Sequence, residues 1–213
     1  MPAADLVDLV LASASPRRRE LLERLGLVLE VAPAEVDETP HADEKPLDYA
    51  RRVAAAKCDT VADGVAAGRD LAVLGADTTV IVEDAILGKP ADDTEARAML
   101  LRLGGRRHEV VTAYTLRFGA RRVERAVTTL VAMRALQPAE VEAYVASGEG
   151  RDKAGAYAVQ GIAAAFVTEL RGSLTNVIGL PLAEVLADLQ ALGALPRYPA
   201  AGFGVGTGGV RKT

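Results

Sequence analysis

The hydrophobic and polar positions of this chain form short apolar runs separated by amphipathic stretches, a pattern typical of an α/β protein. Apolar runs that predict strands lie at residues 6–12, 27–32, 71–74, 78–82 and 163–170. Helical spacing of apolar residues occurs over residues 17–25, 47–67, 94–103, 138–147 and 182–192. Residues 109–118 and 122–133 have the pattern of a β-hairpin that turns at Gly119 and Ala120. We therefore expect an α/β fold with a mixed sheet and flanking helices.

The length of 213 residues suits one domain or two small ones, and is ample for a sizeable hydrophobic core. We assign residues 1–195 to a single domain, within which a hairpin-rich second lobe would fall at about residues 104–150. The remaining residues, 196–213, are rich in glycine and carry no strand or helix pattern. This composition predicts a mobile C-terminal tail.

Charge and cysteine content exclude several classes of protein. The net charge of −4 argues against nucleic-acid binding, so any anion must be bound by a local cluster of cations. A single cysteine, Cys58, excludes a disulfide framework and a structural zinc site, and its place among alanines predicts a core position. The two histidines, His41 and His108, are expected on the surface. No basic region precedes the first apolar run, and no apolar run reaches the ~20 residues of a membrane span. These two features predict a cytoplasmic protein with no membrane partner.

The stretch SASPRRR at residues 13–19 joins a predicted strand to a predicted helix. Free backbone N–H groups and the positive end of the helix dipole meet at such a junction, and arginine forks bind phosphate oxygens there. The alternative is that Arg17, Arg18 and Arg19 form a solvated helix face. Because consecutive helical residues point about 100° apart, at most two of the three can face one ligand.

Three further residues carry candidate chemistry. Asp77, at what we expect to be the end of an apolar strand, is either a general base or Mg²⁺ ligand, or an ordinary turn aspartate. Lys89 follows in AILGKP, which we expect to form a turn; if this segment hairpins back, its ammonium approaches Asp77, and otherwise Lys89 is a surface lysine. Gln160 is the last residue but one of the glycine-rich stretch GRDKAGAYAVQG, where it either reads the edge of a base or belongs to a loop that caps a helix.

Seven segments together resemble the Maf family of nucleoside triphosphate pyrophosphatases. They occur in the family's order and at about its spacing, over residues 6–192: LASASPRRRELL, AEVDE, AAAKC, LGADTTV, LGKP, DKAGAYAVQG and NVIGLPL. The resemblance implies an elongated, two-lobed fold similar to that of inosine triphosphatases, with a central cleft. It also implies hydrolysis of a nucleoside triphosphate to the monophosphate and pyrophosphate, with Mg²⁺ or Mn²⁺ as cofactor.

The resemblance implies roles for nine residues. Asp77 corresponds to the family's catalytic proton acceptor, and Arg17, Thr78 and Gln160 to its specificity residues. The family's other cleft positions are Ser13, Arg18, Glu38, Lys57 and Lys89. On this basis we expect Glu38 and Asp77 to hold the metal, Lys57 and Lys89 to act in catalysis, and Ser13 and Arg18 to bind phosphate.

The sequence GAYAVQG is similar to the branch of the family that acts on dTTP and UTP, whereas another branch, acting on 7-methyl-GTP, has a lysine-serine-glutamate stretch there. Two alternatives stay open: housecleaning of modified pyrimidine nucleotides, and a non-catalytic, nucleotide-binding regulator of septum formation. The sequence also leaves open whether the chain forms a homodimer.

Overall fold

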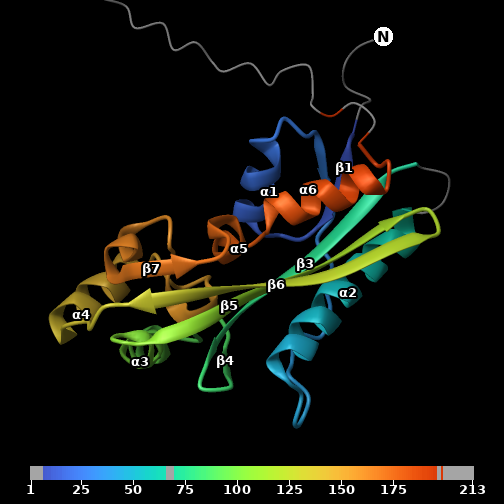
Figure 1. Cartoon of the computed structure of the whole chain (residues 1–213). Coiled ribbons are helices and arrows are strands. Elements are labelled where there is room, and N and C mark those ends of the chain that lie inside the picture. The colour runs from blue at the N-terminus through green and yellow to red at the C-terminus, as the bar shows by residue number, and fades with distance from the viewer. Residues whose placement is uncertain (1–6, 66–69, 196–197, 199–213) are drawn as a thin grey trace, which may run out of the picture.

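A computed structural model of the chain describes residues 7–65, 70–195 and 198 (Figure 1). The predicted tail at residues 196–213 lies outside the described residues apart from Tyr198, as do Leu6 and residues 66–67 at the ends of two predicted elements. Among the described residues, no helix is both long and apolar enough to cross a membrane.

The strands of the described chain form one seven-stranded sheet in the order β2-β1-β3-β5-β6-β7, with β4 paired to β3. The pairs of β1 with β2 and with β3 are parallel, and all others are antiparallel. The predicted mixed sheet is therefore confirmed. The strands are β1 (Leu9–Ala12), β2 (Leu29–Val31), β3 (Ala72–Val82), β4 (Ala85–Leu87), β5 (Arg107–Phe118), β6 (Arg121–Met133) and β7 (Val167–Arg171).

Six α-helices and two short 3-10 helices accompany these strands in the described residues. The helix starts follow local chemistry: Ser15 caps α1 through its hydroxyl with Pro16 in the first turn, and Asp92 caps α3 through its carboxylate. The helices are α1 (Pro16–Glu23), α2 (Pro46–Val65), α3 (Asp93–Leu103), α4 (Pro138–Ser147), η2 (Ala154–Ala156), η3 (Ile162–Phe166), α5 (Leu174–Ile178) and α6 (Leu182–Ala191).

Helices cover both faces of the sheet (Figure 1). Helix α2 packs on one face, against Val10, Ala12 and Val73. At Gly75 its backbone comes so close that an added Cβ would lie 2.5 Å from the carbonyl oxygen of Ala54. The alternate residues of β1 and β3 face the other side, because successive strand residues point to opposite faces.

That other face carries two separate apolar clusters. One, which we call the α1–α6 cluster, packs α1 and α6 against residues such as Leu11, Leu74 and Tyr114. The second, the α3–α4 cluster, packs α3, α4 and η3 against residues such as Val80 and Val110. Along β3 and β5 the polar residues Thr78 and Thr112 lie between these clusters, so this face of the sheet changes from apolar to polar at its middle.

The structure corrects the predicted place of Asp77, which is inside β3 and not at its end. Antiparallel pairing with β5 continues past Asp77, opposite Ala113, and on to Ile81. The strand that does end here is β1, whose last pair with β3 joins Ala12 to Gly75. AILGKP is also not simply a turn, because its first three residues form β4 and the turn lies at Glu83 and Asp84.

The expectation for His108 was wrong, and several element boundaries shift. His108 is only 3 % exposed, because strand alternation turns it away from its exposed neighbour Arg107 and into the α3–α4 cluster. The strand predicted at 163–170 begins as η3 and becomes β7 only at Val167, and the first strand begins at Leu9 and not at Leu6. Helix α5 was not predicted. Cys58 is fully buried and His41 is exposed, as expected.

Candidate active site

A cavity of about 690 Å³ opens where β1 ends, between the α1–α6 and α3–α4 clusters. All nine residues singled out from the sequence line it: Ser13, Arg17, Arg18, Glu38, Lys57, Asp77, Thr78, Lys89 and Gln160. They come from α1, α2, β3 and four connecting segments, so only the tertiary fold brings them together.

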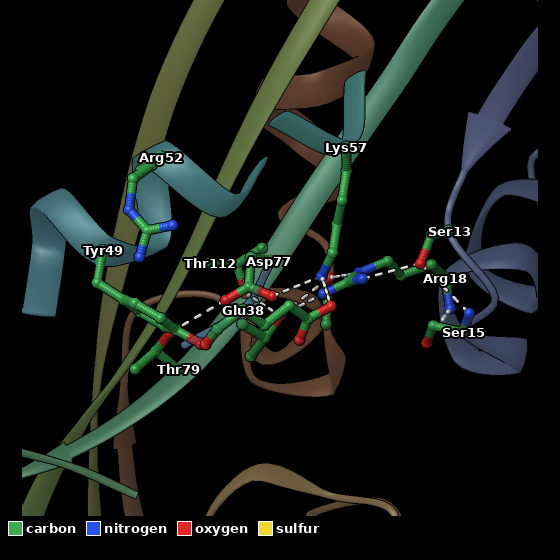
Figure 2. A network of polar contacts seen from close by, with 12 residues as sticks. Ser13, Ser15, Arg18, Glu38, Tyr49, Arg52, Lys57, Asp77, Thr79 and Thr112 are labelled. Carbon is green, nitrogen blue, oxygen red and sulfur yellow. Dashed lines mark hydrogen bonds and ion pairs between the residues drawn. The ribbon is translucent and has the colours of Figure 1, made fainter. Parts of the chain in front are cut away.

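The ammonium of Lys57 lies between two carboxylates (Figure 2). Its Nζ is 2.9 Å from Oδ1 of Asp77 and 2.8 Å from Oε1 of Glu38. The side chains of Lys57 and Asp77 are each 10 % exposed, whereas that of Glu38 is 47 % exposed. Lys57 comes from the α2 face of the sheet, toward which Asp77 also points. The three groups together carry a net charge of −1, and the carboxylate pair remains open to solvent on the Glu38 side.

Asp77 is held on its second oxygen as well. The hydroxyl of Thr79, on the same face of β3, donates to Oδ2 of Asp77 at 3.3 Å. Tyr49 of α2 fixes the segment that carries Glu38, since its hydroxyl donates to the Glu38 carbonyl at 2.9 Å. Burial, with the nearby carboxylates of Asp77 and Glu38, raises the pKa of Tyr49 to about 12, so its phenol stays protonated.

Arg18 reaches the cavity from α1 and is 7 % exposed. Its guanidinium donates to Oγ of Ser13 at 2.9 Å, to the Gly179 carbonyl at 2.9 Å and to Oγ1 of Thr78 at 3.1 Å. Burial lowers the pKa of the Arg18 guanidinium, and the carboxylate of Asp77 opposes that shift; an arginine nevertheless stays charged. Three of its five N–H groups thus fix its position, which leaves two to bind an anion.

Thr78 points to the opposite face of β3 from Asp77, and its hydroxyl is engaged within the protein. Besides accepting from Arg18, it lies 2.9 Å from Oγ1 of Thr112 and 3.3 Å from the Gly179 carbonyl. Thr112 in turn donates to the Asn176 carbonyl at 2.9 Å. Because β1 stops at Ala12, both faces of β3 reach the one cavity at this point.

The arginine cluster divides as the helical geometry requires. Arg17 and Arg18 line the cavity, while Arg19 is exposed and pairs with Glu23 one turn later, at 2.6 Å. Arg17 crosses to the loop after α4, where its guanidinium lies 3.0 Å from Oδ2 of Asp152. Burial favours a higher pKa for Asp152, but hydrogen bonds from Lys153 and Arg17 outweigh it and lower the pKa to about 2.

Lys89 and Gln160 are both exposed residues at the cavity wall. The segment before Lys89 does hairpin back, which the sequence had left open, since β3 pairs antiparallel with β4 from Val80–Leu87 to Val82–Ala85. A backbone bond of 3.0 Å from the Gly155 amide to the Gly88 carbonyl then ties this hairpin to the loop that carries Gln160.

Sequence reasoning missed several residues that hold the site together. Tyr49, Thr79 and Thr112 orient the candidate residues but carry only the signal of an apolar stripe or a strand pattern. Asp152 carried a weak signal, since it stands in the matched segment DKAGAYAVQG, but nothing in the sequence paired it with Arg17.

The donor set fits a hard divalent cation that takes only two carboxylates from the protein and its other ligands from phosphate oxygens and water. Within the described residues, no group of three or more His, Cys, Asp or Glu side chains could hold a metal ion. Glu38 and Asp77 are nevertheless near each other, since both contact the same ammonium of Lys57. Mg²⁺ commonly binds through one or two carboxylates together with phosphate oxygens and water. The arrangement can therefore bind a polyphosphate and place a carboxylate beside it.

Comparison with known proteins gives a family match across most of the chain. The model of the family described as Maf-like protein matches residues 8–192. A protein of Cereibacter sphaeroides named dTTP/UTP pyrophosphatase is 50 % identical over 196 residues, which cover 92 % of this chain and 100 % of that protein. A protein of Sphingopyxis alaskensis with the same name is 53 % identical over 188 residues, covering 87 % and 96 % of the two chains.

The fold also has a counterpart among solved structures. The Staphylococcus aureus Ham1 protein superposes with a TM-score of 0.51 at 15 % sequence identity, over 86 % of this chain and 98 % of that one. At this identity the likeness concerns the fold alone. It agrees with the expectation of a mixed α/β architecture with flanking helices.

Proposed function

This chain belongs to the family of Maf-like proteins, and on that premise we propose that it hydrolyses nucleoside triphosphates to the monophosphate and pyrophosphate. It is then a hydrolase acting on acid anhydrides, with dTTP and UTP as its main substrates. The observation that carries the proposal is the convergence of all nine family-matched residues on one cavity. Relatives named dTTP/UTP pyrophosphatase, about half identical over nearly their whole length, support the choice of substrate.

The reaction requires water to attack the α-phosphorus while the bond from that phosphorus to the bridging oxygen of the pyrophosphate breaks. We assign Asp77 as the group that accepts the proton of the attacking water. The ammonium of Lys57, 2.9 Å away, fixes the orientation of this carboxylate, as does the hydroxyl of Thr79 on its other oxygen. A carboxylate that is held on both sides needs little reorganisation when the reaction occurs.

The triphosphate must be neutralised by cations before water can approach it. In our proposal Arg18 supplies two N–H donors to the phosphates, Lys89 and Lys57 supply point charges, and Ser13 holds Arg18 in place. A divalent metal, Mg²⁺ or Mn²⁺, bound through Glu38 and Asp77 would offset the remaining negative charge. The net charge of −4 argues against nucleic acid as the ligand, whereas the local cluster of cations at the cavity supports a small-molecule anion.

Arg17, Thr78 and Gln160 are assigned to the base. Gln160 is exposed at the cavity wall, and its amide carries both donors and an acceptor for the edge of a pyrimidine. The Thr78 hydroxyl is already bonded within the protein, so we propose that Thr78 affects the choice of base indirectly, by fixing Arg18 and with it the position of the bound triphosphate. Replacement of Gln160 by alanine should reduce discrimination among bases more than it reduces hydrolysis as such.

The decisive experiment is a panel of nucleoside triphosphates with Mg²⁺ or Mn²⁺ and identification of both products. We expect monophosphate and pyrophosphate, most rapidly from dTTP and UTP, whereas release of orthophosphate would contradict the proposal. The variant Asp77→Asn keeps the shape of the side chain without its basicity and should lower kcat by at least about 100-fold. Binding without turnover in the parent protein would instead favour a non-catalytic nucleotide-binding role.

A second measurement addresses the physiological substrate. Competition of 5-methyl-UTP and pseudo-UTP against dTTP would show whether modified pyrimidine nucleotides are preferred. A kcat/KM for the modified nucleotides well above that for dTTP would assign the enzyme to removal of modified pyrimidines.

A further inference from the structure

Gln160 is carried by a tight turn whose backbone decides where its side chain points. The turn spans residues 158–161 and is closed by a bond of 3.1 Å from the Gly161 amide to the Ala158 carbonyl. Gln160 itself is exposed. A long exposed side chain has many rotamers, so its selectivity depends on how firmly the backbone beneath it is held.

One carboxylate outside the cavity holds the far end of this turn. Glu149 accepts the Ile162 amide at 2.8 Å on Oε2 and the Ala163 amide at 3.3 Å on Oε1. These are the second and third amides after Gln160. Burial favours a higher pKa for Glu149, but hydrogen bonds from Ile162 and Tyr144 outweigh it, and the carboxyl stays ionised.

A buried tyrosine links that carboxylate to the near end of the turn. The hydroxyl of Tyr144, which is 2 % exposed on α4, donates to Oε1 of Glu149 at 2.9 Å. The same hydroxyl accepts the Ala158 amide at 3.1 Å. Both ends of the four-residue turn are therefore fixed by one pair of side chains.

The close fit extends to Gly161. A Cβ on this residue would lie 2.1 Å from Oε2 of Glu149, so only glycine leaves the carboxylate in place. Since that carboxylate is held by three donors, it cannot move aside without losing the bonds that define the turn.

We propose that Glu149 and Tyr144 are positioning residues that fix the Gln160 turn and so determine which base the enzyme accepts. Neither touches the cavity, and both lie apart from the Lys57–Asp77 pair. The inference rests on the proposed function, because it assumes that Gln160 reads the base. It predicts that loss of the pair changes selectivity while the hydrolytic machinery remains intact.

The variant Glu149→Gln tests this role. The glutamine side chain keeps one acceptor oxygen but has an NH₂ group in place of the other. Because the facing backbone amides are donors as well, at least one hydrogen bond is lost. We expect the ratio of kcat/KM for dTTP to that for dCTP to fall about tenfold, with kcat for dTTP within about threefold of the parent. Glu142→Gln is the matched control on α4, since Glu142 is an exposed partner of Arg97 at 2.8 Å and should leave the ratio unchanged.

A double variant separates positioning from a general structural effect. In the Gln160→Ala background, Glu149→Gln should change the dTTP/dCTP ratio less than about twofold, because its effect passes through Gln160. A full tenfold further fall in that background would overturn the proposal, and so would an unchanged ratio in Glu149→Gln alone. Should Glu149→Gln fail to fold, Gly161→Ala displaces the same carboxylate and must lower the ratio likewise.

Hydrogen exchange tests, without any substrate, whether Glu149 holds the turn. The Ile162 and Ala163 amides should exchange at least about tenfold faster in Glu149→Gln than in the parent or in Glu142→Gln. Unchanged exchange would show that Glu149 does not hold the turn, whatever the kinetics. If the parent protein releases no pyrophosphate, the proposed function fails, and this measurement still decides whether the pair fixes the turn.

Discussion

Replacement of His108 by phenylalanine should flatten the dependence of stability on pH between 7.5 and 5.0. His108 is 3 % exposed, and its Nε2 lies 2.8 Å from the hydroxyl of Tyr157, a residue of the cavity wall. Its other ring nitrogen, Nδ1, is buried with no hydrogen-bond partner among the described residues. A positive charge on this ring would be placed in the apolar α3–α4 cluster.

The expected magnitude follows from the pKa of this ring in the two states. Burial lowers the pKa of His108 from 6.5 to about 4 in the folded protein. Since the unfolded chain binds more protons, stability is full above about pH 6.5 and is lost as the pH falls toward 4. Linkage then gives a loss of about 2 kcal/mol in the free energy of unfolding between pH 7.5 and 5.0.

Urea denaturation at both pH values measures this loss in the parent and in His108→Phe. The variant leaves the Tyr157 hydroxyl without its partner, so its stability at pH 7.5 should already be lower by about 1–3 kcal/mol. Only the difference between the two pH values tests the argument. His41→Gln is the control, because His41 is the other histidine of the chain and is exposed. Equal losses in the parent and in His108→Phe would refute the reasoning.

Three further predictions concern the contacts around the site. Gly75→Ala should lower the free energy of unfolding, measured by urea denaturation, by about 2 kcal/mol or more, because the new Cβ would lie 2.5 Å from the Ala54 carbonyl oxygen. Gly64→Ala is the control: it has open space around it and should not destabilise the protein. Arg18→Lys should lower kcat/KM for dTTP at least about tenfold, since one ammonium cannot replace a guanidinium bonded to three oxygens. Arg19→Lys should have little effect, and equal activity of the two variants would contradict the role of Arg18 in binding phosphate. Removal of divalent cations with a chelator should abolish pyrophosphate release, and Mg²⁺ or Mn²⁺ should restore it; activity that persists in the chelator would exclude the metal from the mechanism.

Local patterns in the sequence were enough to predict most of the elements. Helical spacing of apolar residues predicted α1 and α3, whose starts are capped in the structure by Ser15 and Asp92, and alternation predicted the hairpin of β5 and β6. These patterns depend on periodicity within a few residues, so they can be recognised without knowing the partners. Where an apolar run is compatible with more than one backbone, as at residues 163–166, the pattern predicted a strand and the chain formed a 3-10 helix.

The sequence by itself determined which residues could carry the chemistry, because the matched segments already contained the nine candidate residues, and each of these lines the cavity. Their arrangement was decided only by the tertiary structure. The end of β1 at Ala12 opens the sheet beside Asp77, and the alternation of β3 directs Asp77 to α2 and Thr78 to α1. Glu38, Lys57 and Asp77 meet because packing of α2 on the sheet joins residues far apart along the chain. Such contacts depend on strand pairing and on how whole elements pack, and no pattern within a short segment encodes them.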